Sequence, residues 1–146
     1  MSLRSRPLRV LIVEDEVLLA LHLEHLVWDA GHEPLGNALA RDEAVRMLRE
    51  MSPDLVLLDI HLLDGPTGIE VARVAAEETD AVVLFMTANR ARIPEDFAGA
   101  CGAIGKPYTE AGMIAALRFI EGRLCDGASA GPVPSSIELS PAWAAH

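Results

Sequence analysis

The sequence predicts an α/β fold, in which a parallel β-sheet is covered by helices on both faces. Short apolar runs of strand length alternate with amphipathic helical patterns along the chain, and right-handed crossovers between such strands give a parallel sheet. The run Leu55 to Leu58 is too short for a helix of usual length and is apolar throughout, which is typical of a strand buried on both faces. With 146 residues, half of them apolar but only 4% aromatic, the chain can form one domain with an aliphatic core.

Each expected element has its own signal. The first strand is rich in β-branched residues, the first helix carries a leucine stripe, and Gly31 is placed to end that helix. The expected strands are Leu8 to Val13, Glu33 to Ala38, Leu55 to Leu58, Ala81 to Met86 and Ala103 to Gly105, and the expected helices are Val17 to Ala30, Asp42 to Met51, Ile69 to Glu78 and Glu110 to Leu124. Between Asn89 and Gly102, Pro94 allows only a short or irregular fourth helix of a turn or two.

The composition changes near the C-terminus. From Asp126 onward the chain has two Gly, three Pro and four Ser, with no Lys or Arg, and such a segment buries little apolar surface. We therefore expect an N-terminal extension over residues 1–7, one domain over residues 8–124, and a flexible tail over residues 125–146 that is dispensable for folding. Trp143 is the residue of this tail that could dock on the domain.

Charge and composition exclude several classes of protein. A formal net charge of -10 argues against binding to nucleic acid, which needs clustered Lys and Arg. No apolar run approaches the 18 residues of a membrane span, and the basic N-terminus is not followed by the long apolar stretch of a signal peptide. We therefore expect a cytoplasmic protein in which Cys101 and Cys125 are free thiols.

Four of the expected strands end in functional side chains. Glu14 and Asp15 follow the first strand and Asp59 the third, while Thr87 and Lys106 follow the last two. The carboxyl ends of parallel strands meet at one edge of the sheet. Three carboxylates brought together there need positive charge to hold them, and hard oxygen ligands suit Mg²⁺. A carboxylate nucleophile, a cation, a lysine and a hydroxyl are the groups that phosphoryl transfer to Asp59 requires.

In the order and spacing of these residues, and in the pair Lys106-Pro107, the chain from about Leu8 to Leu124 resembles a response-regulator receiver domain of two-component signalling, of the single-domain type. The resemblance implies a flavodoxin-like, doubly wound, five-stranded parallel sheet with strand order 2-1-3-4-5. It implies Mg²⁺ held by Asp15, Asp59 and the backbone carbonyl of His61, with Glu14 acting through water, and a cis peptide bond before Pro107. It also implies that His61 and Asn89 flank the phosphoryl group and influence its hydrolysis.

The function implied is that of a phosphoacceptor. A histidine kinase or a phosphotransfer protein phosphorylates Asp59, Thr87 and Lys106 contact the phosphoryl group, and an unidentified downstream protein reads the change. We expect no enzymatic turnover beyond self-phosphorylation from donors and autodephosphorylation. A second apolar row on the first helix, formed by Val17, Leu21 and Trp28, suggests a homodimer.

Two other interpretations stay open. A small Mg-dependent phosphatase of the haloacid-dehalogenase type would also use Asp59 as a nucleophile, but such enzymes usually carry a second Asp at the position held here by His61. A receiver fragment of a larger hybrid kinase would show the same residues as a single-domain regulator.

The sequence departs from the family pattern at Ala103, where an aromatic residue is usual. Without a ring to turn at this position, we expect phosphorylation to reshape the segment from Asn89 to Gly102 instead. Its few apparent apolar anchors suggest that opening it costs little. Tyr108 is the alternative route.

Overall fold

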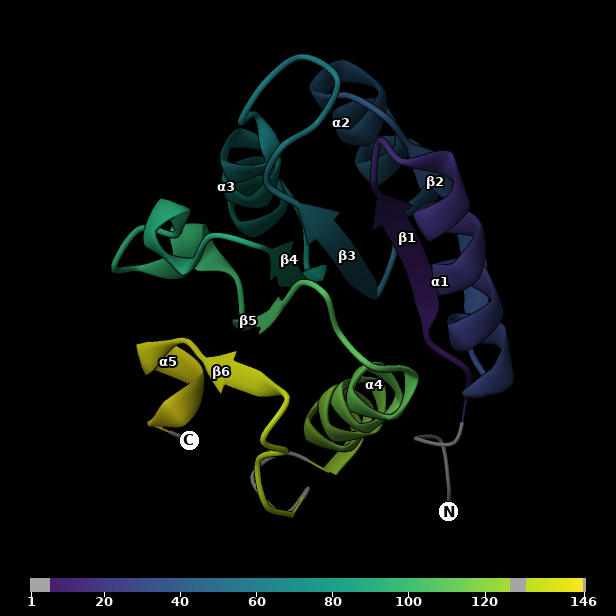
Figure 1. The fold of residues 1–146 in the computed structure, drawn as a ribbon, viewed down its shortest axis with the longest axis vertical. Helices are drawn as coiled ribbons and strands as arrows, with labels where there is room; N and C mark the ends of the chain where they lie inside the picture. The colour runs from purple at the N-terminus through teal and green to yellow at the C-terminus, as the bar shows by residue number, and fades with distance from the viewer. Residues whose placement is uncertain (1–5, 127–130, 146) are drawn as a thin grey trace.

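The computed structural model describes residues 6–126 and 131–145, which form a single six-stranded sheet with helices on both faces (Figure 1). The strands are β1 (Arg9–Val13), β2 (Glu33–Ala38), β3 (Leu55–Asp59), β4 (Val82–Thr87), β5 (Gly102–Gly105) and β6 (Ile137–Leu139). The helices are α1 (Val17–Asp29), α2 (Arg41–Met51), α3 (Gly68–Glu78), α4 (Glu110–Asp126) and α5 (Pro141–Ala144), with 3-10 turns η2 (Arg90–Arg92) and η3 (Phe97–Gly99).

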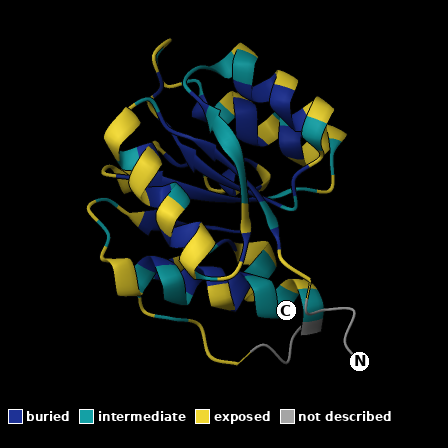
Figure 2. Cartoon of the chain, turned by 90° about the vertical axis from the view of Figure 1, so that its right-hand side faces the viewer, coloured by how far each residue is buried: buried dark blue, intermediate teal, exposed yellow. Residues whose placement is uncertain are grey.

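The predicted sheet is confirmed. Strands β1 to β5 are parallel and lie in the order β2-β1-β3-β4-β5. Every residue of β3, at the centre of the sheet, is buried, as the continuous apolar run predicted. One buried cluster packs α2 and α3 against one face, and a second packs α1 and α4 against the other. The outer faces of the helices are exposed (Figure 2).

The irregular fourth helix is also confirmed, because only the short turns η2 and η3 lie between β4 and β5. The expectation that this segment has few apolar anchors is wrong from Ile93 onward. Ile93, Phe97, Ala98 and Ala100 are all buried in the cluster shared with α2 and α3. Opening this part of the segment would therefore expose core side chains.

The expectation of a flexible tail is wrong for residues 137–144. Ile137–Leu139 adds β6 antiparallel to the outer edge of β5, and Pro141–Ala144 forms α5 (Figure 1). Trp143 packs against the cluster that includes α4. A three-residue strand has too little sequence pattern to be recognised without its partner, so composition alone gave the wrong answer here. Residues 127–130 lie outside the described residues.

Three further predictions concern the apolar row of α1, the end of that helix at Gly31, and membrane spans. Val17, Leu21 and Trp28 of α1 are 58%, 50% and 68% exposed, so the apolar row is uncovered in the single chain and a homodimer through it stays a prediction. Gly31 has a φ of +87°, the left-handed conformation expected where a helix ends in glycine. Within residues 6–126 and 131–145, no helix is long and apolar enough to cross a bilayer.

Candidate phosphoacceptor site

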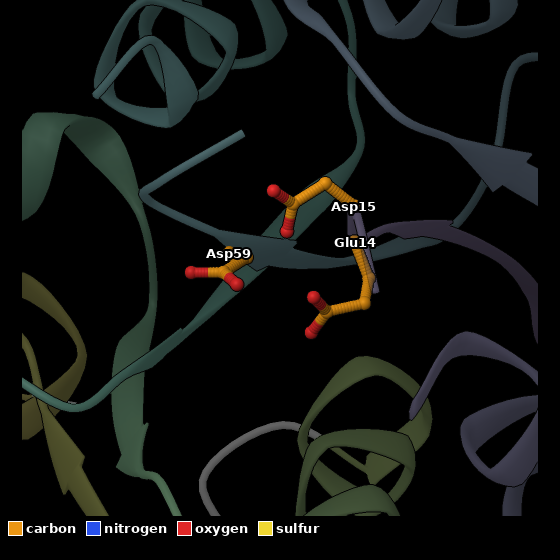
Figure 3. Close-up of side chains that lie close together, drawn as sticks. All are labelled: Glu14, Asp15 and Asp59. Atoms are coloured by element: carbon orange, nitrogen blue, oxygen red, sulfur yellow. The ribbon is translucent and has the colours of Figure 1, made fainter. Parts of the chain in front are cut away.

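Three predicted acidic residues meet at the carboxyl edge of the sheet. Glu14 and Asp15 directly follow β1, and Asp59 ends the neighbouring strand β3, with Val13 and Leu58 paired in register. One carboxylate oxygen from each lies within 4.8 Å of those of the other two. Figure 3 shows the three side chains at the ends of these two strands. Parallel pairing of adjacent strands thus brings together residues that are 44 positions apart in the sequence.

Lys106 supplies the positive charge within this group. Its Nζ donates to Asp59 Oδ2 at 2.9 Å and to Glu14 Oε1 at 3.1 Å. The lysine follows β5, and the peptide bond to Pro107 is cis, as the resemblance implied. Three carboxylates and one ammonium leave a formal charge of -2 (three negative, one positive) at the site. The protein's own residues therefore do not balance the charge of this pocket.

The acceptor carboxylate has a hydrogen-bond donor at each oxygen. Lys106 binds Oδ2, and the backbone N–H of His61 donates to Oδ1 at 3.2 Å. Asp59 is only 7% exposed, so it is fixed by these bonds while it still reaches the surface. His61 itself is exposed, and the predicted roles of its carbonyl oxygen and side chain stay predictions.

Thr87 ends β4, one position beyond the register pair of Asp59 and Met86. Its hydroxyl donates to the carbonyl oxygen of Asn89 at 3.1 Å and accepts from the Asn89 N–H at 3.0 Å. The threonine is therefore beside the acceptor strand, and its hydroxyl is engaged with the start of η2. A hydroxyl has only one proton to donate, so a new acceptor at the site would compete with Asn89.

Burial and charge shift the pKa values of the site. Glu14 has no exposed surface, and burial raises the pKa of its carboxyl group although Glu16 N–H and Lys106 both hydrogen-bond to it. Burial opposes the charged form of Lys106, but the hydrogen bonds and charges of Asp59 and Glu14 outweigh it and raise the pKa of the ammonium group. Lys106 is thus positively charged at neutral pH, with both partners in place.

The donor set fits a hard divalent cation. All three residues offer carboxylate oxygens, which Mg²⁺ prefers, and their oxygens are close enough to share one ion. The uncompensated charge of two at this edge is the charge of Mg²⁺. A cation of this kind would relieve the repulsion among Glu14, Asp15 and Asp59.

Gly68 is a site residue whose role the sequence did not reveal. It is the first residue of α3, and its N–H donates to the carbonyl oxygen of Ile60 at 2.9 Å. A Cβ atom at Gly68 would lie 2.2 Å from the backbone oxygen of Asp59. The helix can therefore approach the end of the acceptor strand only because this residue has no side chain. The glycine was visible in the sequence, but its contact with Asp59 was not.

Comparison with known proteins agrees with this geometry. Residues 10–118 match the family model of the response regulator receiver domain. The chain is 36% identical over 114 residues to the phyllosphere-induced regulator PhyR of Methylorubrum extorquens, covering 74% of this chain and 41% of PhyR. It is 30% identical over 115 residues to the chemotaxis protein CheY of Thermotoga maritima, covering 77% of this chain and 96% of CheY.

The structural comparison gives the same result. The solution structure of the receiver domain of PhyR from Erythrobacter litoralis superposes with a TM-score of 0.71 at 30% identity, covering 88% of this chain and 97% of that domain. The matched region thus spans less than half of the M. extorquens regulator but nearly all of the T. maritima CheY. With the acceptor aspartate, the acidic pair and the lysine in one pocket, the chain belongs to the response regulator receiver domain family.

Proposed function

We propose that this protein is a phosphoacceptor switch that receives a phosphoryl group on Asp59 from a histidine kinase or a phosphotransfer protein. The observation that carries the proposal is the pocket formed by Glu14, Asp15 and Asp59, in which Lys106 binds two of the three carboxylates at 2.9 and 3.1 Å. The pocket has an anchored nucleophile and a positive charge beside it, which are the requirements of transfer to a carboxylate.

In the transfer step, a carboxylate oxygen of Asp59 attacks the phosphorus atom of the donor's phosphohistidine. The new P–O bond forms, the P–N bond breaks, and the imidazole leaves with the electron pair of that bond. Lys106 is positioned to pair with a phosphoryl oxygen, since its Nζ already binds Asp59 Oδ2. The Thr87 hydroxyl is the neutral donor available for a second oxygen.

Receiver domains bind Mg²⁺ at an acidic pocket, and this chain has such a pocket. In our proposal Asp15, Asp59 and the backbone carbonyl of His61 hold the ion, and Glu14 acts through water. Bound Mg²⁺ would offset the charge on the transferring phosphoryl oxygens. The protein performs no turnover of its own beyond accepting and losing the phosphoryl group, and a downstream protein reads the phosphorylated state.

Phosphorylation by a small donor tests the proposal directly. The protein is incubated with Mg²⁺ and acetyl phosphate, and the modified residue is mapped by mass spectrometry of peptides reduced with borohydride. We expect a single label on Asp59, no label in Asp59→Asn, and normal labelling in the control Asp80→Asn, an exposed residue outside the site. A label elsewhere, or none in the wild-type protein, would refute the assignment. Continuous hydrolysis of added phosphate esters would favour the phosphatase alternative.

A further inference from the structure

The outer edge of β5 is covered by the chain's own C-terminus. We call residues 136–144 the C-terminal latch. Its strand β6 pairs antiparallel with β5, with Gly102 opposite Leu139 and Ile104 opposite Ile137. The Ser140 N–H extends this pairing by donating to the Cys101 carbonyl oxygen at 2.8 Å. An uncovered strand edge exposes a row of unpaired backbone groups and is a template for pairing with another chain.

Contacts with α4 and with β5 hold the latch. Ile137 is 8% exposed and packs into the cluster of α4, and the Arg123 guanidinium lies 4.4 Å from the centre of the Trp143 ring and donates to the Trp143 carbonyl oxygen at 3.0 Å. At Gly102 the two strands approach so closely that a Cβ atom would lie 2.4 Å from the Glu138 carbonyl oxygen. The edge is thus shaped to receive an extended strand.

The middle residue of β6 links the latch to the phosphoacceptor site. Arg90 donates from Nε and Nη2 to the two carboxylate oxygens of Glu138 at 2.7 and 2.9 Å. Arg90 is the first residue of η2, the turn that begins directly after Asn89. Asn89 is in turn bound through its backbone N–H and carbonyl oxygen to the Thr87 hydroxyl. A continuous chain of hydrogen bonds and ion-pair contacts therefore runs from the end of β4 to β6.

Phosphorylation would break the first link of this chain. The single hydroxyl proton of Thr87, which now points to the Asn89 carbonyl oxygen, cannot also bind a phosphoryl oxygen. If Thr87 turns to the phosphoryl group, Asn89 loses its fixed position and η2 shifts. The Arg90–Glu138 pair is 48% and 57% exposed, so it can separate without leaving a buried unpaired charge when its arginine moves, and its loss weakens the docking of β6.

We propose that the edge of β5 is an interaction surface for an extended peptide segment of a partner protein, and that the C-terminal latch covers it until phosphorylation of Asp59 releases the latch through Thr87, Asn89 and Arg90. The inference rests on the proposed phosphoacceptor function. The latch itself indicates the partner chemistry: a strand with apolar residues flanking an acidic one, as in Ile137-Glu138-Leu139, which offers backbone pairing to β5 and a carboxylate to Arg90.

The fluorescence of Trp143 reports release of the latch. The sequence has only one other tryptophan, Trp28, so Trp28→Phe leaves Trp143 as the only indole in the full-length chain. Acrylamide quenching is measured with Mg²⁺ alone and with Mg²⁺ and beryllofluoride, a phosphoryl mimic. We expect the quenching constant to rise at least twofold with the mimic. Glu138→Gln should raise it without the mimic, whereas Arg92→Gln, an exposed residue of the same turn with no ion pair among the described residues, should behave as wild type.

Binding of a peptide tests the edge itself. A labelled peptide with the sequence of residues 135–144 is titrated into the full-length chain. The tethered latch competes at a high effective concentration, so Glu138→Lys, which places a cation beside Arg90, is used to displace it. We expect the peptide to bind Glu138→Lys at least tenfold more tightly than wild type, and the mimic to strengthen binding to wild type at least tenfold. A peptide with Lys at the glutamate position should not bind.

The outcomes separate the two proposals. Absence of phosphorylation at Asp59 by mass spectrometry would overturn the proposed function. Normal phosphorylation with unchanged Trp143 quenching would overturn latch release and leave the phosphoacceptor function standing. Equal peptide affinity for Glu138→Lys and wild type would overturn the assignment of the β5 edge. Circular dichroism of each variant confirms that it is folded.

Discussion

The variant Asp15→Asn should be more stable than wild type without Mg²⁺ and less stable than wild type with Mg²⁺. Asp15 lies within 4.8 Å of a carboxylate oxygen of Glu14 and of Asp59, and Lys106 hydrogen-bonds to those two residues and not to Asp15. At 4.8 Å in water, each repulsion is worth about 0.9 kcal/mol. Two repulsions, partly offset by the attraction of Lys106, make Asp15→Asn more stable than wild type by about 1 kcal/mol without metal.

With Mg²⁺ the sign reverses. At a metal concentration one hundred times its dissociation constant, wild type gains about 2.7 kcal/mol. A variant whose dissociation constant is one hundredfold weaker gains only about 0.4 kcal/mol at that concentration. Asp15→Asn should therefore change from the more stable protein to the less stable one, by a margin of about 1 kcal/mol in each condition.

Urea unfolding at 25 °C, once with a chelator and once with Mg²⁺, measures both free energies of unfolding. Asp80→Asn is the matched control, since it removes the same charge from an exposed position outside the site, and its Mg²⁺-dependent gain should equal that of wild type. An undiminished gain in Asp15→Asn would show that Asp15 is not a metal ligand and that the charge argument for this pocket is wrong.

Three further predictions concern the fold around the site. Gly68→Ala should lower the free energy of unfolding by about 1–3 kcal/mol in urea titrations, because its Cβ atom would meet the Asp59 carbonyl oxygen, while Gly105→Ala, with open space around it, should change little. Burial raises the pKa of Glu14 above 4.5, so wild type loses stability as pH rises from about 4.5 and this carboxyl group must ionise in the folded state. Glu14→Gln has no such proton to lose, so its free energy of unfolding relative to wild type should increase over the same pH range, measured by urea titrations at several pH values. Truncation after Asp126 should lower the free energy of unfolding by at least about 2 kcal/mol in the same assay, since it removes the buried Ile137. Unchanged stability would mean that β6 is not docked in solution.

The residues of the site were predictable because each belongs to a strong local pattern. An apolar strand such as β3 is recognisable from its own sequence, and the rule that functional groups collect at the carboxyl edge of a parallel sheet then places Glu14, Asp59 and Lys106 together. This placement does not require knowing which residues of neighbouring strands pair with each other. Even the irregular region before β5 followed from the effect of Pro94 on helix formation.

The C-terminal strand was not predictable in this way because its stability comes from distant residues. The C-terminal latch contacts Gly102 through β6, Arg90 through Glu138 and Arg123 through Trp143. Each of these lies far away in the sequence, and β6 has only three residues with which to show a strand pattern. Gly and Pro composition predicted a flexible tail here, because composition contains no information on long-range pairing.

The two turns between β4 and β5 differ in how freely they can respond to the site. The η3 turn buries Phe97 and Ala98 in the same cluster as Ala103, so a ring already fills this part of the core although position 103 itself holds none. The η2 turn has no buried residue. Movement of Thr87 can therefore pass to η2 at little cost, whereas moving η3 would expose Phe97. Arg90, the first residue of η2, connects the two sides, with its guanidinium 4.7 Å from the centre of the Phe97 ring and its hydrogen bonds directed to Glu138. In the proposed switch, a shift that starts at Thr87 would be resisted on the core side by the buried Phe97, and on the side of β6 it would meet only the exposed Arg90–Glu138 pair, so no aromatic residue at position 103 is needed to direct it.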